Sequence, residues 1–366
     1  MYLKELSIRN LRNCEESELA LSNKLNCLIG LNGAGKTNVL DAVYFLCMCK
    51  SYFNPSDQQL IKFGETFFTI KGNFINKANE YSIFCSYELN KKKTFKNNQK
   101  EYSRLSDHIG LIPAVMISPA DSLLISESGE SRRRFVDAVI SQFDAAYLET
   151  LMKYNKTVAQ RNKVLKLIAE DGRYAETLDI YNSQLSLYGT EIYEKRKLFI
   201  TDLMDDINTL YAEISDQKED CHIEYHSSLH EYTFDELLQR NAERDRVLQY
   251  TSSGVHKDDL GMLLNSKSIK QIGSQGQQKT FLVALKLAQY RYVQRKTQKS
   301  PLLLLDDVFD KFDQQRVENI ISIVSGDAYG QIFISDTNME RLTLVTEMLQ
   351  LDHCFFDVDA GMVNSI

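Results

Sequence analysis

The segment of residues 30–37, GLNGAGKT, constrains the fold of this chain more than any other. It has the G-x-x-x-x-G-K-[ST] spacing of a phosphate-binding loop. The apolar run before it, residues 25–29, predicts a strand, and the run at 39–46 predicts a helix. Glycines let successive backbone N–H groups face inward, and the helix start adds its positive end. The segment therefore predicts a site for a nucleoside triphosphate.

Two side chains of this loop have defined roles in such a site. Lys36 is placed to contact the outer phosphates, and the Thr37 hydroxyl can ligate Mg²⁺. Residues 76–79 (NKAN) lack the closing aspartate of a guanine-specificity motif, so ATP is the favoured nucleotide. Arg12 lies in a predicted turn that could bring it near the phosphates, although a solvated turn arginine fits equally well. The residues expected to bind ATP are Gly30, Leu31, Asn32, Gly33, Ala34, Gly35, Lys36, Thr37, Asn38 and Arg12.

The apolar strand at residues 301–307 (PLLLLDD) is the expected second half of the site. A carboxylate at a strand end holds Mg²⁺ directly or through water, and a neighbouring carboxylate can orient the attacking water. We therefore expect Asp306 to bind the metal together with Thr37, and Asp307 to position water, which makes both aspartates catalytic candidates. The alternative for two aspartates after an apolar strand is a helix cap.

Other polar residues are weaker candidates for the same site. Ser335, Asp336 and Thr337 follow a later buried strand, where they could sense the γ-phosphate. Either Gln58 or Gln59 could reach Mg²⁺ from a mid-domain loop. A second glycine-containing turn, residues 273–280, leads into an amphipathic helix from Phe281, and alone it is only a weak signal for an anion site.

The central part of the chain divides into a β-meander and a helical block. Residues 66–104 alternate as antiparallel strands do, with a hairpin turn predicted at Asn97–Asn98. From 132 to 215 the apolar spacing predicts two helices of about 40 residues each, separated near Gly172. Residues 234–249 predict one further charged helix, and 353–366 a final hairpin.

A cluster of lysines lies at the end of the meander. Its members are Lys91, Lys92, Lys93, Lys96 and Lys100, with Phe95 and Tyr102 nearby. Lysines that protect a sheet edge are the usual explanation. Contact with a DNA backbone is the functional alternative, and Lys91, Lys92, Lys93 and Lys96 are its candidates.

Composition limits the possible classes of protein. The 366 residues carry a formal net charge of −7, so nucleic-acid binding would have to come from a local patch. No uninterrupted apolar stretch of about 18 residues predicts a membrane span. Seven cysteines without C-x-x-C spacing fit a reducing cytoplasm, and Cys47 and Cys49 are expected to be buried rather than metal-bound. His222 and His226 share a strand face, but metal binding by them is the weaker alternative to a structural role.

The order of these motifs resembles ABC-type ATPase heads and, more narrowly, the RecF family of SMC-like repair ATPases. The resemblance covers almost the whole chain. The segments that carry it are residues 30–38 and 304–309 (LLDDVF), which many ATPases share, and five more specific ones: residues 118–121 (SPAD), 132–137 (RRRFVD), 243–246 (ERDR), 255–260 (VHKDDL) and 274–279 (SQGQQK). It implies an α/β P-loop NTPase lobe of the ABC-ATPase and SMC-head type, formed by residues 1–118 and 250–366, with an inserted, mainly helical lobe at 119–249.

The resemblance also implies a mechanism and partners. ATP would drive formation of a homodimer in which the loop of one subunit and the turn of the other enclose the nucleotide. The residues acting in trans would be Ser274, Gln275, Gly276, Gln277, Gln278 and Lys279. The family further implies binding to double-stranded DNA and to junctions with single strands, and cooperation with RecO and RecR in loading RecA.

Some positions depart from ABC-type patterns. Asp307 stands where transporters and SMC heads have glutamate; RecF-like chains commonly have aspartate, whose shorter reach implies slow turnover. Ser335 replaces the histidine expected in transporters. The alternatives to a repair ATPase are the ATPase subunit of a transporter and an SMC-type architectural protein. About 85 helical residues at 1.5 Å each are too few for the long rod of the latter.

Overall fold

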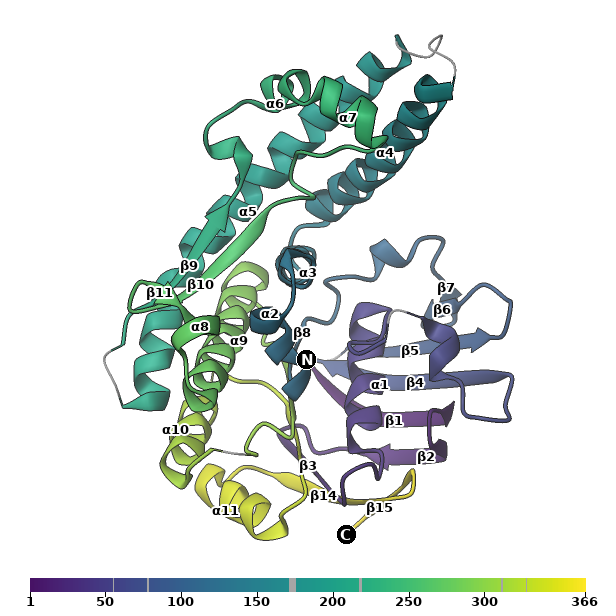
Figure 1. Cartoon of the computed structure of the whole chain (residues 1–366). Helices are drawn as coiled ribbons and strands as arrows, with labels where there is room; N and C mark the ends of the chain where they lie inside the picture. Colours follow the sequence, from purple (N-terminus) through teal and green to yellow (C-terminus); the bar gives the residue numbers. More distant parts are fainter. Residues whose placement is uncertain (55, 78, 171–175, 217–218, 311, 327) are drawn as a thin grey trace. The chain divides into compact units, whose positions relative to one another are not determined.

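The computed structural model describes residues 1–54, 56–77, 79–170, 176–216, 219–310, 312–326 and 328–366 (Figure 1). The chain forms two compact units. Unit 1 comprises Met1–Ser122, Thr209–Lys218 and Gln275–Ile366, and unit 2 comprises Leu123–Asn208 and Glu219–Ser274. Unit 1 thus joins both ends of the chain. The boundaries of unit 1 differ from those expected for the ATPase lobe. Residues 250–274 belong to unit 2, and residues 209–218, expected in the inserted lobe, belong to unit 1.

The first sheet of unit 1 is antiparallel, with the strand order β2-β1-β4-β5-β6-β7. Its strands are β1 (Tyr2–Leu11), β2 (Cys14–Ala20), β4 (Phe67–Asn76), β5 (Asn79–Glu88), β6 (Thr94–Asn97) and β7 (Lys100–Glu101). The predicted meander is confirmed, since β4 to β7 pair with their neighbours in sequence. The predicted hairpin turn is wrong by one residue. Asn97 pairs with Lys100, so the turn residues are Asn98 and Gln99, with φ of 48° and 69°.

The second sheet of unit 1 has the order β15-β14-β3-β13-β12-β8. Its strands are β3 (Leu25–Ile29), β8 (Ala114–Ile117), β12 (Leu302–Asp306), β13 (Ile332–Asp336), β14 (His353–Asp359) and β15 (Met362–Ser365). All pairings are parallel except that of β14 with β15, which form the predicted final hairpin. Strands β8, β12 and β13 have nearly continuous apolar sequences because the sheet is covered on both faces.

Helices of unit 1 surround this second sheet. They are α1 (Lys36–Met48), α9 (Gln275–Thr297), α10 (Gln314–Val324) and α11 (Met339–Leu349), with the short 3₁₀ helices Asp57–Leu60, Leu105–Asp107 and Pro119–Ser122. Helix α1 contacts strands of both sheets. Most of its side chains are therefore buried and apolar around the whole helix, including Cys47, as the sequence predicted.

Unit 2 is mainly helical and contains a small antiparallel sheet with the order β11-β10-β9. Its elements are α2 (Leu123–Ser126), α3 (Gly129–Ile140), α4 (Ala145–Glu170), α5 (Thr177–Ser215), β9 (Cys221–His226), the 3₁₀ helix Ser228–His230, α6 (Phe234–Arg240), α7 (Ala242–Leu248), β10 (Asp259–Leu264), β11 (Lys267–Ser268) and α8 (Ile269–Ile272). None of the helices in the described parts of the chain has the length and apolarity that crossing a bilayer requires.

The helix predictions for unit 2 were partly wrong. The first predicted helix is divided into α3 and α4, because the Asp144 carboxylate accepts the Tyr147 N–H at 2.8 Å and starts a new helix. The second predicted helix corresponds to α5, with 39 residues. The predicted helix at 234–249 is interrupted at Asn241. The separator near Gly172 lies outside the described residues.

A partly buried set of ion pairs holds unit 2 together. The Arg196 guanidinium, 4% exposed, donates to both carboxylate oxygens of Asp137 at 3.0 Å and to the Val255 carbonyl at 2.7 Å. Arg132 forms a bidentate pair with Asp259 at 2.7 and 2.9 Å. These bonds join the RRRFVD and VHKDDL segments, so two of the resemblance motifs are explained by the folding of one unit.

Candidate functional site

The phosphate loop connects β3 to α1 in the predicted order. Gly33 and Gly35 have φ of +82° and +121°, values that favour glycine. A Cβ at Gly30 would lie 2.2 Å from the Val358 carbonyl oxygen, so only glycine fits there as well. At Gly33 a Cβ would meet no atom within 4 Å, which leaves open space on that side of the loop.

Two residues that the sequence analysis missed hold this loop in place. Asn13, in the turn between β1 and β2, donates from Nδ2 to the Ala34 carbonyl at 2.9 Å and accepts from Asn38 Nδ2 at 2.7 Å. The Gly361 N–H, in the β14–β15 turn, donates to the same Ala34 carbonyl at 2.8 Å. The signals in the sequence were an Asn and a Gly in hairpin turns, but nothing local relates those turns to the loop.

The first residues of α1 meet the end of β12. The Thr37 hydroxyl lies 3.0 Å from both carboxylate oxygens of Asp306. Lys36 is only 3% exposed, and its Nζ donates to the carbonyls of Gly30 and Leu31 at 2.9 and 3.2 Å. The same Nζ lies 3.9 Å from the Asp307 carboxylate. The structure thus brings together the four side chains that the sequence predicted to form the catalytic part of the site.

Ser335 at the end of β13 orients the two aspartates. Its hydroxyl donates to Asp306 Oδ1 at 2.8 Å and accepts the Asp307 N–H at 3.0 Å. Asp307 has φ of 45°, in the left-handed region, so the chain turns sharply directly after β12. Burial raises the pKa of Asp306 to about 6, and burial also raises the pKa of Asp307 against the opposing effect of Lys36. A nearby cation would favour the charged form of both carboxylates.

The donor set at this position fits Mg²⁺. Protein sites for this ion commonly use one or two carboxylates, with the remaining ligands from phosphates and water. Thr37 and Asp306 supply a hydroxyl and a carboxylate side by side, next to the open side of the loop. Within the described residues, no cluster of three or more His, Cys, Asp and Glu side chains is arranged to bind a metal. A cation held by Thr37 and Asp306 would take its remaining ligands from phosphate oxygens or water.

Three further candidates, Arg12, Gln58 and Gln59, have surroundings of their own. The backbone N–H of Arg12 donates to the Leu60 carbonyl at 2.7 Å. The guanidinium charge of Arg12 opposes the effect of burial, which raises the pKa of Asp41 in α1. The Nε of Arg12 is buried without a hydrogen-bond partner. Gln58 and Gln59 are both exposed, in the 3₁₀ helix Asp57–Leu60. Their contact with Mg²⁺ stays a prediction.

The glycine-glutamine segment forms the start of α9, not a turn that precedes it. The helix has 23 residues and begins at Gln275, six residues before the predicted start at Phe281. The N–H groups of its first turn are directed along the helix axis and have no acceptor within the helix. Lys279 contacts the Asp310 carbonyl and lies 4.6 Å from the centre of the Phe312 ring. The segment is therefore adjacent to the loop that follows β12.

A buried polar network connects α9 with α1. Lys286 Nζ lies 3.0 Å from Asp121 and donates to the Tyr52 hydroxyl at 2.7 Å. The Tyr52 hydroxyl also bonds to Asp121, and the backbone N–H of Tyr52 donates to Asp41 of α1 at 2.7 Å. Lys286 and Asp121 are each 3% exposed. The helix after the phosphate loop and the helix that begins with SQGQQK are thus fixed to each other.

The predicted basic cluster is only partly exposed. Lys93 is 11% exposed; it pairs with Asp57 at 2.7 Å and donates to the Cys49 carbonyl at 2.7 Å. It also lies 4.6 Å from the Phe45 ring centre, so it belongs to the packing around the end of α1 rather than to a surface patch. Lys91 is exposed and pairs with Glu88, and Lys92 is exposed.

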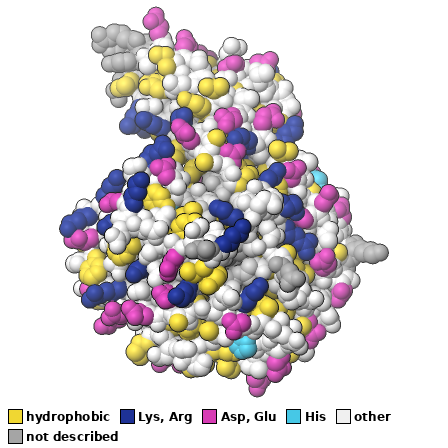
Figure 2. Space-filling view, turned by 180° about the vertical axis from the view of Figure 1, so that it is seen from behind, with side chains coloured by type: hydrophobic (Ala, Val, Ile, Leu, Met, Phe, Trp, Pro, Cys, Tyr) yellow, Lys and Arg dark blue, Asp and Glu magenta, His cyan; other side chains and the backbone are white. Residues whose placement is uncertain are grey.

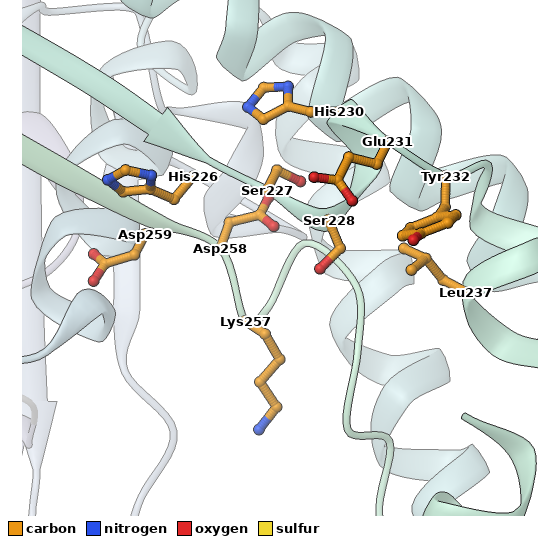
Figure 3. Close-up of a pocket in the computed structure, with 10 residues that line it drawn as sticks. All are labelled: His226, Ser227, Ser228, His230, Glu231, Tyr232, Leu237, Lys257, Asp258 and Asp259. Atoms are coloured by element: carbon orange, nitrogen blue, oxygen red, sulfur yellow. The ribbon is translucent and has the colours of Figure 1, made fainter. Parts of the chain in front are cut away.

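A separate hollow of about 530 Å³ lies in unit 2 between β9, β10 and the turn after β9 (Figure 3). His226 and His230 line it, and Lys257 points away from both (Figure 3). His230 bonds to the Tyr193 hydroxyl and the Tyr225 carbonyl, at 2.9 and 2.5 Å. These two bonds give His230 a structural role. For His222 and His226 of β9, the described residues contain no cluster of three or more His, Cys, Asp and Glu side chains that could bind a metal.

Comparison with known proteins identifies the family. Residues 2–354 match the RecF/RecN/SMC N terminal domain. The chain is 46% identical to the DNA replication and repair protein RecF of Bacteroides thetaiotaomicron, over 100% of this chain and 99% of that protein. It is 45% identical to the RecF of Flavobacterium johnsoniae, over 98% of this chain and 100% of that protein. The chain belongs to the RecF family.

Solved structures agree with this assignment. A structure of the recombination mediator protein RecF with ATP, from the RecFOR pathway, has a TM-score of 0.90 and 29% identity, over 100% of this chain and 97% of that one. A second RecF structure, described as RecF-ATPrS, has a TM-score of 0.89 and 30% identity, over 100% and 98%. An Smc head domain from Pyrococcus furiosus, at 12% identity, shares the fold with a TM-score of 0.59, over 100% and 96%. The predicted resemblance and fold class are confirmed.

Proposed function

We propose that this RecF-family protein is an ATP-switched DNA-binding repair factor. ATP closes a homodimer on double-stranded DNA and on junctions with single strands, and slow hydrolysis opens it again. With RecO and RecR it promotes RecA loading in recombinational repair. The observation that carries this proposal is the convergence of Lys36, Thr37, Asp306 and Asp307 at one end of the parallel sheet. The ATP-bound RecF structures of the RecFOR pathway support it.

In this proposal each side chain acts from the position it already has. Lys36 exchanges its two carbonyl partners for the outer phosphates, and the N–H groups of residues 30–38 bind the remaining oxygens. Mg²⁺ held by Thr37 and Asp306 would neutralise charge on the phosphates. Asp307 accepts a hydrogen bond from the attacking water, and Ser335 keeps both aspartates oriented. A short aspartate makes this a weak, DNA-stimulated ATPase.

The site of one copy is completed by a second copy. The start of α9 offers backbone N–H groups that are directed along the helix axis, and residues Ser274 to Lys279 would place them on the γ-phosphate of the partner's nucleotide. Because closing the dimer requires ATP, nucleotide binding controls when the DNA-binding surface is complete. This coupling explains why slow hydrolysis is sufficient: the nucleotide acts as a switch.

The decisive experiment measures mass and DNA binding in the same samples, with and without ATP and Mg²⁺. Light scattering should show a monomer that becomes a dimer with ATP, and only the dimer should bind DNA. Lys36→Ala should stay monomeric because it loses ATP. Ser274→Arg should keep ATP but not dimerise. A wild-type protein that stays monomeric with ATP and ignores DNA at low salt would refute the proposal.

A further inference from the structure

The first sheet of unit 1 has one face that the core does not use. Its inward side chains, including Ile70, Ile83, Cys85 and Phe95, are buried in the core beside α1. Because side chains alternate along a strand, the residues between them point to the opposite face. That second face is partly or fully exposed over β4, β5 and β6, and it carries mainly polar side chains together with a few apolar ones such as Phe84.

Three residues form a row across the middle of this outer face. Lys71 of β4 pairs directly with Phe84 of β5, and Phe84 pairs directly with Lys96 of β6. With neighbouring strands about 4.8 Å apart, the two lysines stand about 10 Å apart with the aromatic ring between them. Phe84 and Lys96 are half-buried, and Lys71 is exposed.

The row lines a shallow hollow on the sheet. Besides Lys71, Phe84 and Lys96, it is lined by Ser82, Asn98 and Gln99, and its volume is about 800 Å³. This lies within the range of pockets that hold small-molecule ligands. On the left side of Figure 2, which views the molecule from behind, Lys and Arg side chains lie among hydrophobic and acidic ones. The hollow therefore combines two cations, one apolar ring and amide and hydroxyl groups.

The charges around the hollow favour an anionic ligand at its centre. Glu101 pairs opposite Lys96 on the strand at the edge, and Glu5 acts on Lys71 from β1. Both acids lie beyond the lysines, so the positions beside the ring are cationic. An aromatic ring between two cations matches one nucleotide, in which a base with a free face lies between two phosphates. The hydroxyl and amides add donors for base edges or sugar.

We propose that the Lys71–Phe84–Lys96 row binds single-stranded nucleic acid. One base stacks on Phe84, and Lys71 and Lys96 contact the phosphates on either side. A base inside a duplex does not fit this contact, because both of its faces are covered by neighbouring bases. The proposal rests on the proposed function and deepens it: the duplex part of a junction is held by the ATP-closed dimer, and the single-stranded part crosses this sheet.

The test compares two DNAs of equal duplex length, one blunt and one with a single-stranded dT tail. Binding is measured by fluorescence anisotropy with ATP and Mg²⁺ at several salt concentrations. Phe84→Leu should weaken binding of the tailed DNA about 10- to 100-fold, the effect of losing one stacked base, without changing binding of the blunt DNA. Phe84→Tyr keeps the ring and should bind as the wild type does.

The lysines are tested through the salt dependence. Lys71→Gln combined with Lys96→Gln should reduce the slope of log K against log salt by about 1.4 for the tailed DNA, since each single-strand phosphate contact contributes about 0.7. The matched control changes two exposed lysines elsewhere, Lys77→Gln with Lys267→Gln, and should leave that slope unchanged. Unfolding midpoints equal to the wild type show that the variants fold.

The outcomes separate this inference from the function on which it rests. Wild-type protein that binds neither DNA with ATP contradicts the proposed function itself. Wild-type protein that binds both DNAs, while Phe84→Leu retains full affinity for the tailed one, overturns only the inference. Equal losses on the tailed and blunt DNAs overturn it as well, because a site that needs an unpaired base with a phosphate on each side should not bind a blunt duplex equally well.

Discussion

Acidification from pH 7 to pH 5 should destabilise unit 1 through His108. This side chain is fully buried, its Nε2 lies 2.7 Å from the Leu46 carbonyl, and its Nδ1 lies 3.1 Å from the Tyr102 hydroxyl. A carbonyl can only accept, so Nε2 carries the proton and Nδ1 accepts from Tyr102. The neutral ring therefore has both hydrogen bonds satisfied, and a second proton would point at a hydroxyl that is donating.

The size of the effect follows from the pKa. Burial lowers the pKa of His108 to about 4, whereas an exposed histidine has about 6.5. Between these values the unfolded chain binds more protons, so the stabilising contribution is complete above about pH 6.5 and is lost as the pH falls towards 4. Integrating from pH 7 to pH 5 gives a loss of about 2 kcal/mol for this one group.

Urea unfolding at pH 7 and pH 5 measures this loss, and His108→Gln is the matched variant. Glutamine can donate to Leu46 and accept from Tyr102 but does not titrate. Its loss between the two pH values should be about 2 kcal/mol smaller than that of the wild type, whatever its stability at pH 7. Equal losses in both proteins, or an NMR titration of His108 near pH 6.5, would refute this explanation.

Three further changes have defined outcomes. Asn13→Ala removes the hydrogen bonds to the Ala34 carbonyl and to Asn38. At roughly 1 kcal/mol per bond it should weaken ATP binding, measured by calorimetry, about 30-fold; unchanged affinity would show that the loop holds its shape alone. Lys286→Met leaves the Asp121 carboxylate buried without its cation and should lower the free energy of unfolding in urea by about 3–5 kcal/mol. A decrease below about 1 kcal/mol would contradict this expectation. Lys91→Ala with Lys92→Ala should flatten the salt slope for blunt DNA, and an unchanged slope would leave these lysines as protection of the sheet edge.

Local sequence patterns predicted the elements that carry their own signal. The phosphate loop, the strand ending in two aspartates, the meander and the final hairpin all depend on spacing within about ten residues. The hairpin turn at β6 was misplaced because Asn97 and Asn98 both suit turns. Its position was decided by the pairing of Phe95 with Cys85, which places the Phe95 ring in the core.

Burial of a charged side chain could not be predicted in the same way. Lys93 stands in a run of three lysines, and all three are equivalent in the sequence. Only the fold brings it against Asp57, the end of α1 and the ring of Phe45, which are 36 or more residues away. Lys93 makes one partly buried ion pair and one bond to a carbonyl at a position where the sequence suggested a surface for DNA.

The start of α9 shows a third kind of difference. Glycine at 276 and the polar residues around it predicted a turn, yet glutamine and lysine are good helix formers, and tertiary packing outweighs the roughly 1 kcal/mol that glycine costs in a helix. This changes the expected chemistry. Backbone N–H groups in a first helical turn are fixed in direction, whereas those of a flexible turn are not, so a helix start is better suited to recognise a phosphate on a second copy.

The phosphate loop itself depends on distant parts of the chain. Its Ala34 carbonyl accepts from Asn13 near the beginning and from Gly361 near the end, and a Cβ at Gly361 would lie 2.1 Å from the Asn13 carbonyl oxygen. Two hairpin turns therefore close on the loop from opposite ends of the sequence. A loop held only by its own residues would not need contacts with distant turns. Here hydrogen bonds from both ends of the chain hold the loop, so we expect its shape to depend on the folding of both.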